Sequence, residues 1–255
     1  MKILETLKFY RETGRKSIAV LIDPDKVEDH SQLQNLLRLA TENCIDFIFV
    51  GGSLITTSNL SSVVKDIKTN VSIPVVLFPG SSLQIDGSAD AILFLSLISG
   101  RNPDLLIGQH VIAAPILKNN KIEVMPTGYI LINSGKTTSV AYISNTTPIP
   151  EDKYSLAACT ALAGQMLGLQ LIYLDAGSGA EREISAKMIA TVRKSVDVPL
   201  IVGGGINSGR KAMAALEAGA DLIVIGNALE KDASLLTEIS DKVYDWNQSL
   251  AKKSS

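Results

Sequence analysis

Two glycine clusters stand directly after short apolar runs in the C-terminal part of the sequence. Gly203, Gly204 and Gly205 follow the run LIV, and Gly226 and Asn227 follow LIVI. Because glycine lacks a Cβ, backbone N–H groups in such segments can approach an anion closely, and the N-terminus of a following helix adds a favourable dipole. The clusters predict a phosphomonoester site with mostly neutral donors, although they could simply allow tight turns. A larger side chain at Gly204 should block the phosphate and leave the fold intact.

Asp23 and Ser53 suggest metal chemistry. Asp23 opens the segment DPDK after the apolar run AVLI, and Ser53 follows two glycines after FIFV. Mg²⁺ prefers hard oxygen ligands, and it usually takes one or two of them from protein and the rest from water and substrate phosphates. The two residues therefore predict a magnesium site for a diphosphate, so that two phosphorylated substrates would bind. The structural alternative is that each side chain caps a turn or a helix.

The elements that must position these residues alternate regularly along the chain. Continuous apolar runs predict strands buried on both faces, as in a parallel α/β sheet, and the longer amphipathic stretches between them predict helices. The predicted strands, some with the loops that follow them, lie at 17–23, 46–53, 73–81, 90–99, 128–135, 169–180, 198–206 and 221–229. Eight such units predict a modified (β/α)8 TIM barrel that forms a single domain over residues 1–255. The loops after its strands would share one face and converge there.

Several local features qualify this barrel. Segment 81–89 is too short and too rich in Gly and Ser for a full helix, so the third helix is expected to be incomplete or missing. Residues 1–17 predict a helix that caps one end of the fold, and 139–144 predict a strand that extends a hairpin. Ser31 is the predicted N-cap of a helix over 31–43. A doubly wound open sheet is the competing fold, but no G-x-G-x-x-G follows the first strand.

Composition excludes several classes of protein. Hydrophobic residues make up 46% of the chain and the net charge is −2, which disfavours a disordered chain and a nucleic-acid partner. No apolar run reaches the length of about 18–20 residues that a transmembrane helix needs. Cys44 and Cys159 predict reduced core thiols in a cytoplasmic protein. His30 and His110 share no spacing with Cys or carboxylates, so we expect them to be structural or surface residues, without a zinc site.

Six segments together carry a family signature. LIDPDK, FVGGS, TTPIP, IYLDAGSGA, IVGGGI and VIGNALE occur in this order across nearly the whole chain. They closely resemble the geranylgeranylglyceryl phosphate synthase family, and its second, archaeal-like group in particular. The resemblance implies a (β/α)8 barrel with an altered third helix that forms dimers or hexamers. It also implies Mg²⁺-dependent transfer of a prenyl group, geranylgeranyl above all, from a prenyl diphosphate to sn-glycerol 1-phosphate, with an ether bond formed and diphosphate released. Transient contact with a membrane surface would release the product.

The resemblance also assigns residues. It implies that Asp23 and Ser53 are the magnesium ligands. The residues it implies for the glycerol phosphate are Tyr173, Leu174, Asp175, Ala176, Gly177, Ser178, Gly179, Gly204, Gly205, Gly226 and Asn227. Position 175 departs from the family pattern YLEAGSGA, because it holds Asp where the family has Glu. The carboxylate is kept on a side chain one methylene shorter.

Asp175 and Tyr173 are the predicted catalytic residues. Asp175 would orient the glycerol hydroxyl and accept its proton, and Tyr173 would stabilise positive charge on the prenyl group. The structural alternatives are a loop-capping carboxylate and a core tyrosine. Two other functions stay open. The first is another phosphate-binding barrel enzyme, such as a sugar-phosphate isomerase or aldolase, in which Lys26 and Asp25 are loose candidates for the catalytic residues. The second is a non-catalytic phosphometabolite-binding protein that needs no metal.

Overall fold

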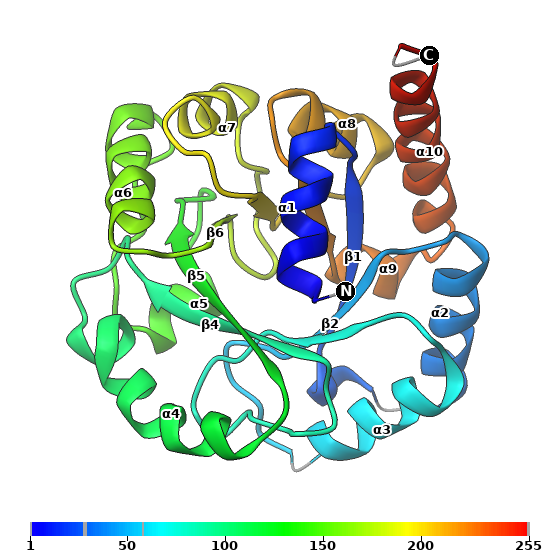
Figure 1. Ribbon diagram of the computed structural model, residues 1–255, viewed down its shortest axis with the longest axis horizontal. Helices are drawn as coiled ribbons and strands as arrows, with labels where there is room; N and C mark the ends of the chain where they lie inside the picture. Colours follow the sequence, from blue (N-terminus) through cyan, green and yellow to red (C-terminus); the bar gives the residue numbers. More distant parts are fainter. Residues whose placement is uncertain (1, 28–29, 58, 254–255) are drawn as a thin grey trace.

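Eight parallel strands close into one barrel, in which each strand pairs with the next and β8 pairs with β1 (Figure 1). The computed structural model describes residues 2–27, 30–57 and 59–253. The strands are β1 Ser17–Ile22, β2 Phe47–Val50, β3 Val75–Leu77, β4 Ala91–Leu97, β5 Glu123–Leu131, β6 Leu171–Asp175, β7 Leu200–Gly203 and β8 Leu222–Ile225. The predicted (β/α)8 barrel is confirmed.

Helices surround the strands in Figure 1. The α-helices are α1 Ile3–Thr13, α2 His30–Glu42, α3 Leu60–Asn70, α4 Gln109–Asn119, α5 Ser139–Ile143, α6 Tyr154–Met166, α7 Ala186–Arg193, α8 Gly209–Glu217, α9 Asn227–Lys231 and α10 Leu235–Lys253. A 3₁₀ turn, η1 Pro24–Lys26, follows β1, and a π-helical turn, η2 Asp104–Gly108, precedes α4. Alternate strand residues enter two buried layers, so Ala19 and Phe49 fill the barrel while Val20 packs towards the helices.

The third helix is missing, as predicted. All residues from 78 to 90 are described, and no helix lies among them between β3 and β4. The chain there passes tightly over the loop after β2. A Cβ on Gly80 would lie 2.5 Å from the carbonyl oxygen of Gly52 and 2.6 Å from that of Ser53. Glycine at position 80 therefore permits the loops after β2 and β3 to meet.

The N-terminal helix α1 closes the barrel at the amino end of its strands. Ile3 and Leu7 are buried in the same cluster as the residues that fill the barrel. The backbone N–H groups of Ile3 and Leu4 donate to the carboxylate of Glu123, the first residue of β5, at 2.7 and 3.1 Å. This carboxylate satisfies donors that the first turn of a helix leaves unpaired. The predicted capping helix is thereby confirmed.

Two local predictions are wrong. Residues 139–143 form the short helix α5 and not a strand, because a four-residue apolar run fits either element and a closed parallel barrel offers no edge for a hairpin. Helix α2 begins at His30, so Ser31 lies inside its first turn and is not its N-cap.

The two cysteines are exposed and not in the core. Both are free thiols. Cys44 adopts a positive φ of 51° in the turn after α2, and Cys159 lies on the outer side of α6. Apolar neighbours in the sequence do not put a residue in the core if that residue lies in a turn or on the outer side of a helix. Among the helices of the described residues, none combines the length and apolar character needed to cross a membrane.

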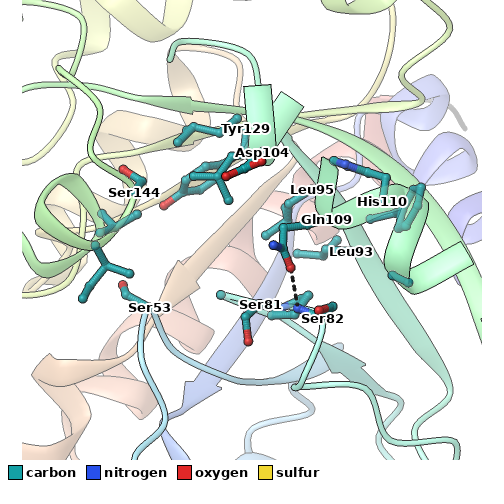
Figure 2. A pocket seen from close by; sticks show the side chains of 18 of the residues that line it. Ser53, Ser81, Ser82, Leu93, Leu95, Asp104, Gln109, His110, Tyr129 and Ser144 are labelled. Carbon is teal, nitrogen blue, oxygen red and sulfur yellow. Dashed lines mark hydrogen bonds between the residues drawn. The ribbon is translucent and has the colours of Figure 1, made fainter. Parts of the chain in front are cut away.

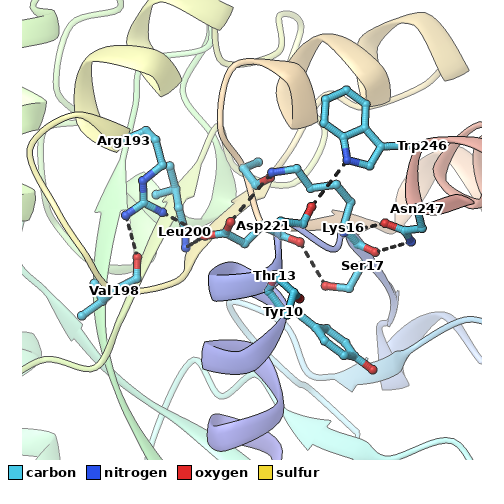
Figure 3. A network of polar contacts seen from close by, with 12 residues as sticks. Tyr10, Thr13, Lys16, Ser17, Arg193, Val198, Leu200, Asp221, Trp246 and Asn247 are labelled. Carbon is cyan, nitrogen blue, oxygen red and sulfur yellow. Dashed lines mark hydrogen bonds and ion pairs between the residues drawn. The ribbon is translucent and has the colours of Figure 1, made fainter. Parts of the chain in front are cut away.

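A buried ionic network joins the amino ends of β7, β8 and β1 (Figure 3). Asp221 accepts a hydrogen bond from the backbone N–H of Leu200 at 2.8 Å and pairs with Arg193 at 2.9 Å. Lys16 lies 3.8 Å from Asp221 and donates to the carbonyl of Ala220 at 2.7 Å. Burial lowers the pKa of Lys16. The carboxylate of Asp221 therefore compensates the buried cation of Lys16 and the partly buried cation of Arg193 at the seam where the barrel closes.

Replacing Asp221 should destabilise the protein strongly. In Asp221→Asn the buried cation of Lys16 and the partly buried cation of Arg193 lose their counter-charge, so the free energy of unfolding in urea should fall by about 3–5 kcal/mol. Asp197→Asn is the matched control, since Asp197 pairs with Arg11 at 3.3 Å and its side chain is 90% exposed. Its loss should stay within about 1 kcal/mol. Equal losses in the two variants would contradict the network's role.

Candidate active site

A polar pocket of about 890 Å³ opens at the carboxyl ends of the strands. The loops after β1, β2, β3, β5, β6, β7 and β8 all contribute to it. The predicted site residues that line it are Asp23, Ser53, Tyr173, Asp175, Gly177, Ser178, Gly179, Gly204, Gly205, Gly226 and Asn227. Leu174 and Ala176 do not line it, because they face the helices and belong to the outer buried layer. The structure thus gathers the rest of the predicted set in one place.

Asp175 is a buried carboxylate held from two sides. It ends β6 and is 7% exposed. Its Oδ2 accepts a hydrogen bond from the Tyr129 hydroxyl at 2.5 Å, and its Oδ1 accepts one from the backbone N–H of Gly177 at 2.8 Å. Burial raises the pKa of Asp175, while the two hydrogen bonds act in the opposite direction. The carboxylate is therefore fixed in orientation and binds a proton more tightly than it would in water.

Aromatic rings form the wall of the pocket beside Asp175. Tyr173 stacks on Phe78 with ring centroids 5.2 Å apart and meets Tyr129 edge-on at 5.5 Å. Burial, with a further contribution from Asp175, raises the pKa of Tyr173 well above its usual value, so its hydroxyl stays neutral. A Cβ on Gly203 would lie 2.5 Å from that hydroxyl oxygen, which explains the glycine there. The ring faces offer π electrons to positive charge.

Tyr129 and Thr138 also line the pocket, and sequence reasoning missed both. Tyr129 lies within β5, not after it, directly opposite Tyr173 in the register of β5 with β6. Paired aromatic residues on one face of neighbouring strands are the signal that could have found it. Thr138 is 5% exposed, and its Oγ1 has no hydrogen-bond partner among the described residues. A buried hydroxyl of this kind is available to a ligand.

The glycines after β7 are required by the backbone itself. Gly204 and Gly205 have φ angles of +81° and +73°, which side chains rarely adopt. A Cβ on Gly204 would also lie 2.8 Å from Oδ1 of Asp175 and 2.9 Å from the backbone nitrogen of Ala176. The expectation that a larger residue at position 204 leaves the fold intact is therefore wrong. Such a residue would strain the loop and displace Asp175.

Asp23 and Ser53 line the same pocket, and their carboxylate and hydroxyl are oxygen donors of the kind that magnesium prefers. Oδ1 of Asp23 accepts a hydrogen bond from the backbone N–H of Asp25 at 3.1 Å, so this residue does cap the turn η1. Its carboxylate lies against Gly52, where a Cβ would come within 3.4 Å of Oδ1. The described residues contain no group of three or more His, Cys, Asp or Glu suited to a metal. Magnesium completed by substrate phosphates needs no such group.

Asp25 joins the loop after β1 to the loop after β2. Its carboxylate accepts hydrogen bonds from the N–H and hydroxyl of Thr56 at 2.6 and 2.8 Å, and from those of Thr57 at 3.1 and 2.6 Å. These hydrogen bonds lower the pKa of Asp25 to about 2, and the bond from the Thr57 hydroxyl has the largest effect. A carboxylate committed in this way is a poor general acid or base, which disfavours the isomerase or aldolase alternative.

A largely apolar cavity of about 300 Å³ adjoins the polar pocket (Figure 2). The residues that line both spaces are Ser53, Pro79, Gly80, Leu95, Tyr129, Val140 and Ile143. Figure 2 shows Ser53 on one side of the cavity and His110 on the other. The His110 ring packs edge-on against Phe94 at 4.5 Å, and burial lowers the pKa of His110. The other histidine, His30, is exposed and lies 3.5 Å from Asp66.

Comparison with known proteins shows the family to which the chain belongs. Residues 11–244 match the PcrB family. The chain belongs to this family. It is 57% identical over 246 residues to the geranylgeranylglyceryl phosphate synthase of Spirosoma linguale, which covers 96% of this chain and 98% of that protein. It is 46% identical over 254 residues to the protein of the same name from Pyrococcus furiosus, with 98% and 100% covered.

A solved structure of the family has the same fold. The (S)-3-O-geranylgeranylglyceryl phosphate synthase of Thermoplasma acidophilum, in complex with sn-glycerol-1-phosphate, matches with a TM-score of 0.89 at 33% identity. The match covers 95% of this chain and 98% of that one. The resemblance drawn from the six sequence segments is therefore confirmed.

Removing the Tyr129 hydroxyl should raise the pKa of Asp175. The hydrogen bond from Tyr129 stabilises the charged carboxylate, so its loss in Tyr129→Phe leaves the effect of burial less opposed. The titration midpoint of the Asp175 carboxyl carbon, followed by ¹³C NMR, should move to higher pH. Tyr142→Phe is the control, since Tyr142 lines the pocket but is 79% exposed. A midpoint that stays in place or moves down in Tyr129→Phe would contradict this account.

Proposed function

We propose that this protein is a prenyltransferase that joins a prenyl group, geranylgeranyl above all, to sn-glycerol 1-phosphate through an ether bond and releases diphosphate. The observation that carries the proposal is the continuity of the polar pocket with the apolar cavity at Ser53, Tyr129 and Ile143. A prenyl diphosphate has a long apolar chain and a charged head, whereas glycerol phosphate is polar throughout. The two substrates together match the two connected spaces, and the family relatives support the same activity.

The diphosphate head binds where the loops after β1 and β2 meet. Asp23 and Ser53 would hold a magnesium ion there, and the ion would supply positive charge that offsets the charge of the leaving diphosphate. From this point the prenyl chain extends into the apolar cavity. Phe94, Leu95 and Leu105 line that cavity and exclude water from the chain.

The glycine segments after β6, β7 and β8 bind the phosphate of glycerol 1-phosphate and bring its free terminal hydroxyl to Asp175. Asp175 orients this hydroxyl and accepts its proton as the oxygen bonds to the allylic carbon and the bond from that carbon to diphosphate breaks. Tyr173 stabilises the positive charge that develops on the prenyl group. Tyr129 keeps the carboxylate of Asp175 in place through its 2.5 Å hydrogen bond.

We also propose homo-oligomers, dimers or hexamers, and transient contact with a membrane surface during product release. Leu54, Tyr142 and Ile143 line the pockets and yet are exposed. The exposed apolar side chains on α4 are Val111, Ile112 and Ile116. Clusters of this kind mark interaction surfaces. The first set suits a lipid product that leaves the pocket, and the second suits a second copy of the chain.

A prenyl-transfer assay tests the function directly. Radiolabelled sn-glycerol 1-phosphate, or its 3-phosphate enantiomer as control, is incubated with magnesium and prenyl diphosphates of several lengths. We expect label in an organic-extractable product with the 1-phosphate and geranylgeranyl diphosphate, and a loss of product when a chelator removes the metal. Binding of glycerol phosphate without transfer, whether or not magnesium is present, would instead support a phosphometabolite-binding protein.

Three substitutions of Asp175 test its role as proton acceptor. Asp175→Asn keeps the shape but is a very poor base, so kcat should fall by about 10²-fold or more, with a smaller change in glycerol phosphate affinity. Asp175→Glu should retain substantial activity, and Asp175→Ala should lose both rate and affinity. If the residue only positions substrate, Asn would be mild and Ala would raise KM. Wild-type kcat in the Asn variant would rule out Asp175 as the base.

A further inference from the structure

A chain of hydrogen bonds crosses the mouth of the polar pocket. Nζ of Lys26 donates to Oδ1 of Asn227 at 2.8 Å, and Nδ2 of Asn227 donates to Oγ of Ser178 at 3.0 Å. The three residues come from the loops after β1, β8 and β6, and all line the pocket. The ammonium group of Lys26 is thereby held beside two of the glycine segments that are expected to bind phosphate.

Lys26 alone carries positive charge among the described residues that line this pocket. The ionisable acids in that lining are Asp23 and Asp175, and the glycine segments offer neutral N–H donors. Lys211, which reaches the carbonyl of Gly205 at 3.4 Å, pairs with Glu183 at 2.9 Å and lies outside the lining. Lys26 is therefore the cationic side chain of the described lining that a phosphate dianion placed in the pocket could meet.

The backbone that carries Lys26 is fixed. Lys26 ends the turn η1, which Asp23 caps at its start. The Asp25 carboxylate, through its four hydrogen bonds to Thr56 and Thr57, ties this turn to the loop after β2. The lysine stem thus starts from a defined point, which reduces the conformational entropy lost when its ammonium group binds an anion.

We propose that Lys26 is a phosphate-binding residue whose ammonium group exchanges the amide oxygen of Asn227 for a phosphate oxygen of the bound glycerol phosphate. The identity of this substrate rests on the proposed function. The ammonium group and the phosphate carry opposite charges, and a charge-assisted hydrogen bond between them is roughly twice as strong as one between neutral groups. Asn227 holds the ammonium group at the pocket until the phosphate arrives. Lys26 thus contributes to affinity for the phosphorylated substrate and not to the bond-making step.

Calorimetric titration with sn-glycerol 1-phosphate, without prenyl diphosphate, tests the proposal. Lys26→Gln should raise Kd by about tenfold or more, and Lys26→Arg should restore most of the affinity because it keeps the charge. Lys194→Gln is the control. Lys194 is an exposed lysine at the C-terminal end of α7, before the amino end of β7, and it is absent from the lining. Its Kd should change less than about twofold, as expected for a surface charge far from the pocket. Equal weakening in both Gln variants would overturn a specific contact.

Two further measurements separate this proposal from its alternatives. Inorganic pyrophosphate should bind Lys26→Gln and the wild type with similar affinity, and selective loss of pyrophosphate binding would assign Lys26 to the diphosphate and overturn the proposal. In the transfer assay Lys26→Gln should raise KM for glycerol phosphate and leave kcat nearly unchanged. An unchanged KM would refute the role of Lys26 while the proposed function stands. If the wild type shows no transfer activity but its binding of glycerol phosphate depends on Lys26, the proposed prenyltransferase function is refuted and the contact between Lys26 and phosphate is supported. Unchanged thermal unfolding of the variants excludes a folding defect.

Discussion

The pairing of β8 with β1 is the constraint on which the site depends. It sets Ser17 beside Leu222 and closes the sheet, so the loops after the first and last strands become neighbours. The hydrogen bond from Lys26 to Asn227 spans this seam at its carboxyl end. At the amino end of the same seam, Asp221 compensates the charges of the buried Lys16 and the partly buried Arg193. Residues from opposite ends of the chain can share one ligand only because the seam is closed.

The missing third helix has a consequence for the substrate that the barrel can take. Where a full helix would pack against β3 and β4, a loop runs instead, and its residues Pro79, Ser81 and Ile85 line the apolar cavity. Helix α5 and the turn η2 contribute Ile143 and Leu105 from the other side. The segment that replaces the third helix therefore lines the apolar cavity beside the polar pocket, where we propose that the prenyl chain lies.

Much of this arrangement could be predicted because strand ends are easy to locate in the sequence. Asp23, Ser53 and Asp175 follow continuous apolar runs, and the barrel brings such ends together. Tyr129 could not be found in this way, since it lies within β5 and reaches Asp175 only through the register of neighbouring strands. The segment 139–144 is predicted as a strand, yet residues 139–143 form the helix α5, because a short apolar run has no decisive period. Side-chain partners and short elements depend on tertiary packing, which local patterns do not contain.

The contacts around Asp175 bear on the effect of having aspartate at this position and not glutamate. Aspartate is one methylene shorter than the glutamate that the sequence resemblance leads us to expect here, and its oxygens accept hydrogen bonds from Tyr129 and Gly177 at the end of β6. These two hydrogen bonds fix the orientation of the carboxylate. If Asp175 is the base that we propose, the substrate hydroxyl has to be brought to it, and the proposed phosphate contacts would do this by holding the other end of the glycerol phosphate. Proton transfer would then depend on how precisely the substrate is anchored.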